Sequence, residues 1–171
     1  MQMHILERLR RAYAGAASGF ALHDKLNHPT GHVKYEVRRA GKLIERVDDH
    51  NLIVISSQPI HSQLLGGNFT GNNLAQFGIG TNLTSPVFGN TSLTGQYLNA
   101  IQGVSYPNGP TGDGVQFAFG LGTADASAYG MAIGEFGLLT PTGLLYARKT
   151  RTTPLNFESD IALSGTWTIS F

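Results

Sequence analysis

Short alternating stretches separated by turn residues dominate the chain after Leu74. In VQFAFGLG, one face collects larger apolar side chains and the other small or polar ones, the apolar set being Val115, Phe117, Phe119 and Leu121. A period of two is typical of a β-strand with one buried face, and Gly, Pro and Asn between such stretches favour turns. The pattern predicts a mainly β (α+β) chain built on an antiparallel β-sandwich or a barrel-like sheet.

Strands are also expected on both sides of this region. HVKYEVRRAGKLIERV alternates before and after Ala40-Gly41, which predicts a β-hairpin with one solvated face. LAQFGIGT and LNAIQGVSYP each predict a strand, and RTTPLNFESD is expected to be a crossover connection. IALSGTWTISF predicts a final strand whose core-facing residues are Trp167, Ile169 and Phe171.

One mostly buried helix is predicted over residues 48–67. Asp48 or Asp49 can cap its N-terminus, and Gly66-Gly67 can end it. Pro59 removes a backbone donor, so a bend or break is expected near that residue. The apolar residues compatible with one face of this helix are Leu52, Ile53, Ile60, Leu64 and Leu65.

Residues 1–31 are expected to form an arm and a linker ahead of a single β-rich domain, residues 32–171. HILERLRRAYA places apolar side chains at helical spacing and charged ones elsewhere on the wheel, which predicts a short basic helical arm. The following GAASGFALHDKLNHPTG has no clean period and is interpreted as a linker. The docking residues predicted on the arm are Ile5, Leu6, Arg8, Leu9, Arg10, Arg11 and Tyr13.

Charge is concentrated at the two ends of the chain. From His50 to Ala147 there is no Lys or Arg, and the only acids there are Asp113, Asp125 and Glu135. A long span without cations favours packing against neighbouring subunits, although a surface rich in uncharged Asn and Thr is the alternative. The net charge of +1 gives no overall field that would favour nucleic acid or an acidic membrane.

The residues that usually carry chemistry are sparse or poorly spaced. The chain has no Cys, and its six His residues lack the HxH or HExxH spacing of a metal site. The GxG pairs in FGIGT and FGLGT lack the third glycine and the helix of a dinucleotide site, and the serines lack a GxSxG elbow. We therefore predict no metal, no cofactor and no enzymatic activity.

Glu135 is the one acid inside a long apolar run, EFGLLTPTGLLYARK. Strand alternation assigns Ile133, Glu135 and Gly137 to one face, with TPTG as the turn to a second strand. A buried carboxylate needs partners, so we expect Glu135 to accept bonds from backbone amides or to pair with Arg148 or Lys149. Catalysis with a second carboxylate is the alternative.

The cations that follow this hairpin have their own interpretation. Arg148, Lys149 and Arg151 are expected at an exposed strand end, where they protect the edge or meet an acidic partner subunit.

The order of these motifs resembles that of a tailed-bacteriophage virion protein. HNLIVISSQPIHSQLLGG, FGIGTNLTSPVFGNTSLTG, VQFAFGLG, IGEFGLLTPTGLLYARK and GTWTISF follow one another over residues 50–171. The second half is also similar in pattern to the baseplate-attachment domains of phage tail fibres. Because the chain ends directly after this segment and carries an arm, the resemblance implies a small structural subunit rather than a complete fibre.

This resemblance implies a fibre base, collar, baseplate connector or capsid decoration subunit. Such a protein would assemble in the host cytoplasm into a homo-oligomer, a trimer or a ring, and would bind other virion proteins rather than membrane or nucleic acid. A carbohydrate-binding or glycan-cleaving module is the alternative, with Tyr97, Tyr106, Tyr129 and Trp167 as candidate sugar-stacking residues. A nucleic-acid-binding assembly factor that uses the basic arm ranks behind both.

Overall fold

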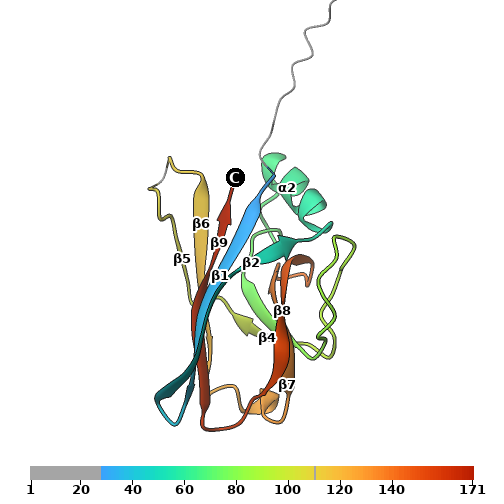
Figure 1. The fold of residues 1–171 in the computed structure, drawn as a ribbon. Helices are drawn as coiled ribbons and strands as arrows, with labels where there is room; N and C mark the ends of the chain where they lie inside the picture. The colour runs from blue at the N-terminus through green and yellow to red at the C-terminus, as the bar shows by residue number, and fades with distance from the viewer. Residues whose placement is uncertain (1–27, 110) are drawn as a thin grey trace, which may run out of the picture.

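The part of the chain that the structure describes is a curled antiparallel sheet that forms a half-barrel, with one α-helix at its upper end (Figure 1). The computed structural model describes residues 28–109 and 111–171. The sheet has nine strands in the order β4-β3-β7-β8-β2-β1-β9-β6-β5. The elements are β1 (Thr30–Arg39), β2 (Lys42–Ile53), α2 (Ser57–Leu65), β3 (Gln76–Gly80), β4 (Tyr97–Ala100), β5 (Gly103–Ser105), β6 (Gly114–Leu121), the 3₁₀ turn η1 (Ala126–Ala128), β7 (Ala132–Leu139), β8 (Leu145–Asn156) and β9 (Ile161–Ser170).

The hairpin predicted around Ala40-Gly41 is confirmed as β1 and β2. Both turn residues have positive φ, 47° at Ala40 and 81° at Gly41, which suits the tight turn of a two-residue hairpin. In β1, the core side takes Val33, Tyr35 and Val37, as the alternation predicts.

The helix prediction is wrong at its N-terminal half. β2 continues through Ile53, so Asp48 and Asp49 lie in a strand paired with β1 and cap no helix. The helix spans only Ser57–Leu65, and Pro59 lies in its first turn, where a missing backbone donor leaves no helical bond unmade.

The helix is also less buried than expected. Of its residues only Ser57 and Ile60 are buried, and Leu65 is 90% exposed. The predicted stop is confirmed, because Gly66 is the C-cap and Gly67 has a φ of 81°. The helix therefore covers the end of the sheet with one narrow apolar face.

Two further strand predictions need correction. LNAIQGVSYP is divided between β4 and β5, which pair with β3 and β6 at opposite ends of the strand order. Ile101 N–H donates to Ala75 and Gln102 N–H donates to Ala118, so this short link brings the two ends of the sheet together. RTTPLN extends β8 rather than crossing over, and Pro154 lies within that strand.

Aromatic side chains fill the space inside the curl. Phe77 and Phe119 stack with ring centres 4.1 Å apart, although they come from strands in different halves of the sheet. Trp167 is 0% exposed and meets Phe119 edge to face. Trp167 and Ile169 are core residues as predicted, but Phe171 is not, since it follows the last strand and is 53% exposed.

A second apolar cluster covers the outer face of β3, β7 and β8. Leu93 comes from the long loop 81–96 and packs there with Val54, Leu139 and Leu145. The seven residues of β7 from Ile133 to Leu139 are consequently all buried, which shows that this strand is covered on both faces.

Candidate functional site

Glu135 lies under the loop 81–96 and not inside the barrel. The pairing of β7 with β8 shifts between Ile133 and Glu135, so Ile133 joins Phe136 and Leu138 in the main core. The predicted grouping of Ile133 with Glu135 is therefore wrong, because a β-bulge changes which face each residue takes. Glu135 is nevertheless 0% exposed.

Both carboxylate oxygens of Glu135 have partners. Arg148 Nε donates to Oε2 at 2.5 Å, and the Thr94 backbone N–H donates to Oε1 at 2.7 Å. Arg148 Nη1 also donates to Asn90 Oδ1 at 2.9 Å. Thr94 and Asn90 both belong to the loop 81–96, so the buried ion pair fastens this loop to the sheet.

The other two cations of β8 do not lie on a free strand end. Among the described residues, β2 pairs with β8 only at Leu52 and Ile53, and beyond that point the two strands separate. Lys149 binds Asp49 across this gap, and Arg151 Nη2 donates to Glu45 at 2.7 Å. We call these two ion pairs the seam. The expected acidic partner of Lys149 and Arg151 is thus supplied by β2 of the same chain.

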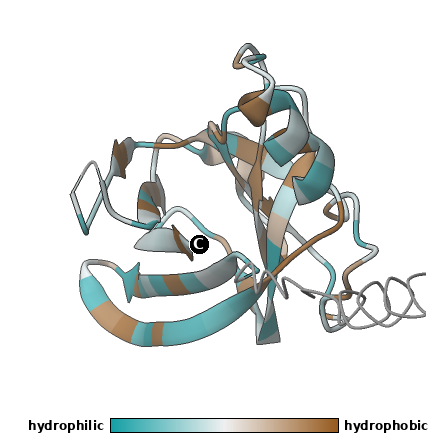
Figure 2. Ribbon diagram, turned by 90° about the horizontal axis from the view of Figure 1, so that it is seen from above, coloured by the Kyte–Doolittle hydropathy of each residue, from teal (hydrophilic) through white to brown (hydrophobic). Residues whose placement is uncertain are grey.

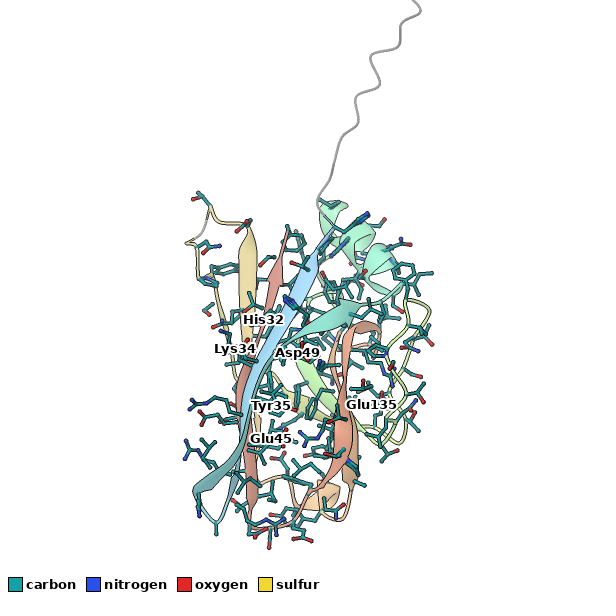
Figure 3. All side chains as sticks on the ribbon, viewed as in Figure 1. His32, Lys34, Tyr35, Glu45, Asp49 and Glu135 are labelled. Carbon is teal, nitrogen blue, oxygen red and sulfur yellow. The ribbon has the colours of Figure 1, made fainter. Side chains whose placement is uncertain are left out.

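Burial and neighbouring charges shift the pKa values of two side chains along the seam, Tyr35 and Asp49. Arg151 Nη1 donates to the Tyr35 hydroxyl at 2.8 Å, and burial of that hydroxyl raises the pKa of Tyr35 to about 12. The hydrogen bond from Lys149 lowers the pKa of Asp49 below its usual value. Figure 3 labels Tyr35, Glu45 and Asp49 on the β1–β2 half and Glu135 on the other.

The remaining acids of the cation-free span are held by local contacts. Asp125 is buried and accepts hydrogen bonds from the Tyr97 hydroxyl and the Asn99 amide, at 2.8 and 3.0 Å, and from the Gly122 backbone. Asp113 accepts from the Asn108 side chain. Within residues 28–109 and 111–171, no three His, Asp or Glu side chains are grouped so as to hold a metal ion.

An apolar cavity of about 400 Å³ lies at the upper end of the curl, and we call it the open-end pocket. It has the size of many ligand sites. Five elements or their ends contribute to it, among them α2, β5, β8 and the residue after β9. Its lining includes Ile60, His61, Val104, Tyr106, Tyr146 and Phe171.

Two polar side chains meet at the wall of the open-end pocket. His61 Nε2 lies 2.8 Å from the Tyr146 hydroxyl oxygen, and the two rings also meet edge to face. Burial lowers the pKa of His61 and raises the pKa of Tyr146, so both groups are neutral near pH 7. The pocket thus offers an apolar wall with one neutral hydrogen-bonding pair.

Large apolar side chains are also exposed on the surface. Val104, Tyr106 and Phe171 form the rim of the open-end pocket, and Figure 2 looks down on this end of the molecule, with α2 and the C-terminus around it. A second group, which we call the loop patch, consists of Ile55, Val87 and Phe88. The Ile55 N–H donates to the Phe88 carbonyl at 2.8 Å, which joins this part of the loop to the chain before α2.

Sequence reasoning missed the open-end pocket, because its walls come from residues 60–171 and no local motif joins them. The one available signal was His61 within an apolar helical stretch. The predicted docking residues Ile5 to Tyr13 lie outside the described residues. No helix within the described ranges has the length and apolar character needed to cross a membrane.

Comparisons of the chain with protein-family models, with curated proteins and with solved structures find no match.

Proposed function

We propose that the protein is a non-enzymatic structural component of a tailed-phage particle, which self-associates and docks onto other virion proteins. The observation that carries this proposal is the exposure of large apolar side chains on a surface region without Lys or Arg. The loop patch and two of the three rim residues, Val104 and Tyr106, lie in the cation-free span from His50 to Ala147, and the third, Phe171, lies after the last cation, Arg151. Such surfaces favour contact with another protein.

The state of the ionisable groups supports a structural role. Each acid of the cation-free span is engaged in contacts within the chain, and Glu135 in particular holds the loop 81–96 together with Arg148. A general acid or base needs access to substrate, whereas the carboxylate of Glu135 is enclosed on both sides. This arrangement fits a scaffold better than a glycosidase.

The proposed position of the protein on the particle rests on the order of its sequence motifs over residues 50–171. A half-barrel with its long loop fastened to one face is compatible with a sandwich-like or barrel-like attachment domain. The positions we propose on the particle are a fibre base, a collar, a baseplate connector or a capsid decoration site. A trimer suits a fibre base, and a ring of higher order suits a collar.

The proposal is tested by the mass and symmetry of the purified full-length chain, using light scattering and electron microscopy. Mass spectrometry of purified particles of the phage that encodes it gives the second readout. We expect a discrete homo-oligomer and a stoichiometric virion band. A monomer that is also missing from the particles would overturn the proposal.

Tyr106 favours a carbohydrate-binding module as a second candidate, because it is exposed at the rim of a cavity. Trp167 contributes nothing to such a site, since it is completely buried. A glycan array distinguishes the two functions: binding that is lost in Tyr106→Ala without loss of folding would favour the carbohydrate module.

A further inference from the structure

We propose that the open-end pocket is the binding site for the N-terminal arm of the same chain. The arm inserts its apolar side chains into the pocket, namely Ile5, Leu6, Leu9 and Tyr13. This inference goes beyond the proposed role in a particle and does not depend on it. Its consequence is that the arm reaches another protein only after leaving the pocket.

The start of the described chain lies beside the pocket. Thr30, the first residue of β1, pairs with Ser170, which directly precedes the rim residue Phe171. His28 and His61 line one neighbouring cavity of about 640 Å³, and His61 also lines the open-end pocket. The described chain therefore begins at the end of the domain where the open-end pocket lies (Figure 1).

The length of chain between the arm and the domain is sufficient for this insertion. Residues 14–27 separate Tyr13 from His28. Fourteen residues span up to about 46 Å when extended, which exceeds the distance needed to return to an adjacent rim. A tether of this kind holds the arm at an effective concentration on the order of millimolar, so a modest affinity is enough to fill the pocket.

The open-end pocket and the apolar face of the predicted arm are chemically complementary. Among the described residues that line the pocket, none is Lys, Arg, Asp or Glu. The arm sequence places its apolar residues at helical spacing, and Glu7, Arg8, Arg10 and Arg11 fall elsewhere on the wheel. An amphipathic segment that docks by one face keeps its charges in water, as in other helix-in-groove contacts.

Disulfide crosslinking of the full-length chain tests the proposal, because the natural sequence has no Cys to interfere. The variant Leu9→Cys/Val104→Cys joins the apolar face of the arm to the rim. We expect rapid formation of an intrachain disulfide at low protein concentration, about tenfold faster than in the controls. Intact mass and peptide mapping identify the bond, and gel migration separates intrachain from interchain products.

Two matched variants serve as controls. Arg11→Cys/Val104→Cys uses the opposite face of the predicted helical arm, and Leu9→Cys/Lys42→Cys uses an exposed residue at the β1–β2 turn, at the other end of the sheet. Equal rates in all three variants would overturn the proposal, because they would reflect random collisions. Products that are only interchain would overturn it in favour of a second copy.

Hydrogen exchange gives a readout that needs no new cysteine. In full-length Leu9→Asp, we expect faster exchange than in the wild type at residues 104–106 and 169–171, with Arg8→Asp unchanged. Unchanged exchange in Leu9→Asp would contradict the proposal, whatever the oligomeric mass of the protein. Conversely, a monomeric protein that is missing from the particles but passes both tests would retain the arm-binding pocket and lose the particle assignment.

Discussion

Glu135 shows how one buried acid can organise a long loop. Its side chain lies between the outer face of β7 and the loop 81–96, and it joins a guanidinium of the sheet to a backbone N–H of the loop. Removing water from two charges is costly, so such a pair is maintained only when further hydrogen bonds satisfy both partners. Thr94 supplies one for Glu135, and Asn90 supplies one for Nη1 of Arg148, whereas Nη2 of Arg148 is buried without a hydrogen-bond partner among the described residues.

Replacing Glu135 by Gln is therefore expected to destabilise the protein strongly. The amide retains an acceptor for Thr94 but leaves the buried Arg148 guanidinium without a countercharge. Loss of one partner of a buried pair costs about 3–5 kcal/mol of unfolding free energy. Urea unfolding followed by circular dichroism measures this cost, and a loss below about 1 kcal/mol would contradict the structural role.

Two variants calibrate this measurement. Glu135→Gln/Arg148→Met removes both charges and should recover part of the lost stability. Asp49→Asn breaks the seam pair between Asp49 and Lys149, whose side chains are 55% and 17% exposed respectively. This change should cost only about 0.2–1 kcal/mol of unfolding free energy, because water screens that pair.

His61 is expected to make the stability of the protein depend on pH. Burial places its pKa in the folded state below the ordinary value of 6.5, so the unfolded chain binds its proton first as the pH falls. The contribution of His61 is complete above about pH 6.5 and is lost progressively below it. Urea midpoints from pH 7.5 to 5 should decline more steeply for the wild type than for His61→Gln.

His50 provides the control for this pH series, since it is exposed in β2 and does not line the open-end pocket. His50→Gln should retain the steep decline of the wild type. A decline that is identical in His61→Gln and the wild type would show that His61 does not titrate differently in the two states.

Among the elements, the loop 81–96 depends on glycines in the strands beneath it. A Cβ at Gly80 would lie 2.5 Å from Glu135 Oε1 and 2.8 Å from the Thr94 carbonyl, and one at Gly137 would meet Leu93. These positions lack side chains so that the loop can lie against the sheet.

Gly80→Ala is therefore expected to loosen the loop. The added methyl group has to displace backbone at Thr94 or the buried carboxylate, at a cost of about 1–3 kcal/mol. Chymotrypsin cleavage after Phe88 should accelerate in this variant. Gly89→Ala is the matched control within the same loop, because its Cβ meets nothing within 4 Å; equal cleavage of both variants would contradict the role of Gly80.

The sequence predicts elements well where the pattern is local. Alternation located β1, β3, β6, β7 and β9, and the turn residues located both hairpins. The prediction failed at residues 48–53, where Asp48 and Asp49 suggested a helix N-cap. Strand pairing with β1 outweighs that local preference. The prediction also failed at Ile133, where only a β-bulge reveals the true face.

At the scale of the whole molecule, long-range closure determines the candidate sites. The Glu135–Arg148 contact could be expected from one hairpin, because the two residues lie close in sequence and on adjacent strands. The open-end pocket could not be expected, because residues of α2, β5, β8 and β9 meet there only after the sheet has curled, and the seam could not be expected, because it joins β2 to β8 across about a hundred residues of sequence. No period in a single strand encodes that curvature.

The loop patch leads to the last prediction, which concerns assembly. Phe88 is half exposed beside Val87 and Ile55, in a span without cations, so a Lys at position 88 places charge in the proposed contact between subunits. Phe88→Lys should lower the assembled mass, measured by light scattering, while its thermal unfolding stays close to that of the wild type. The control is Ile44→Lys, which places the same charge at an equally exposed apolar position near the β1–β2 turn. If both variants assemble like the wild type, subunits meet through another surface; if both dissociate, charge alone is responsible and the loop patch is not the interface.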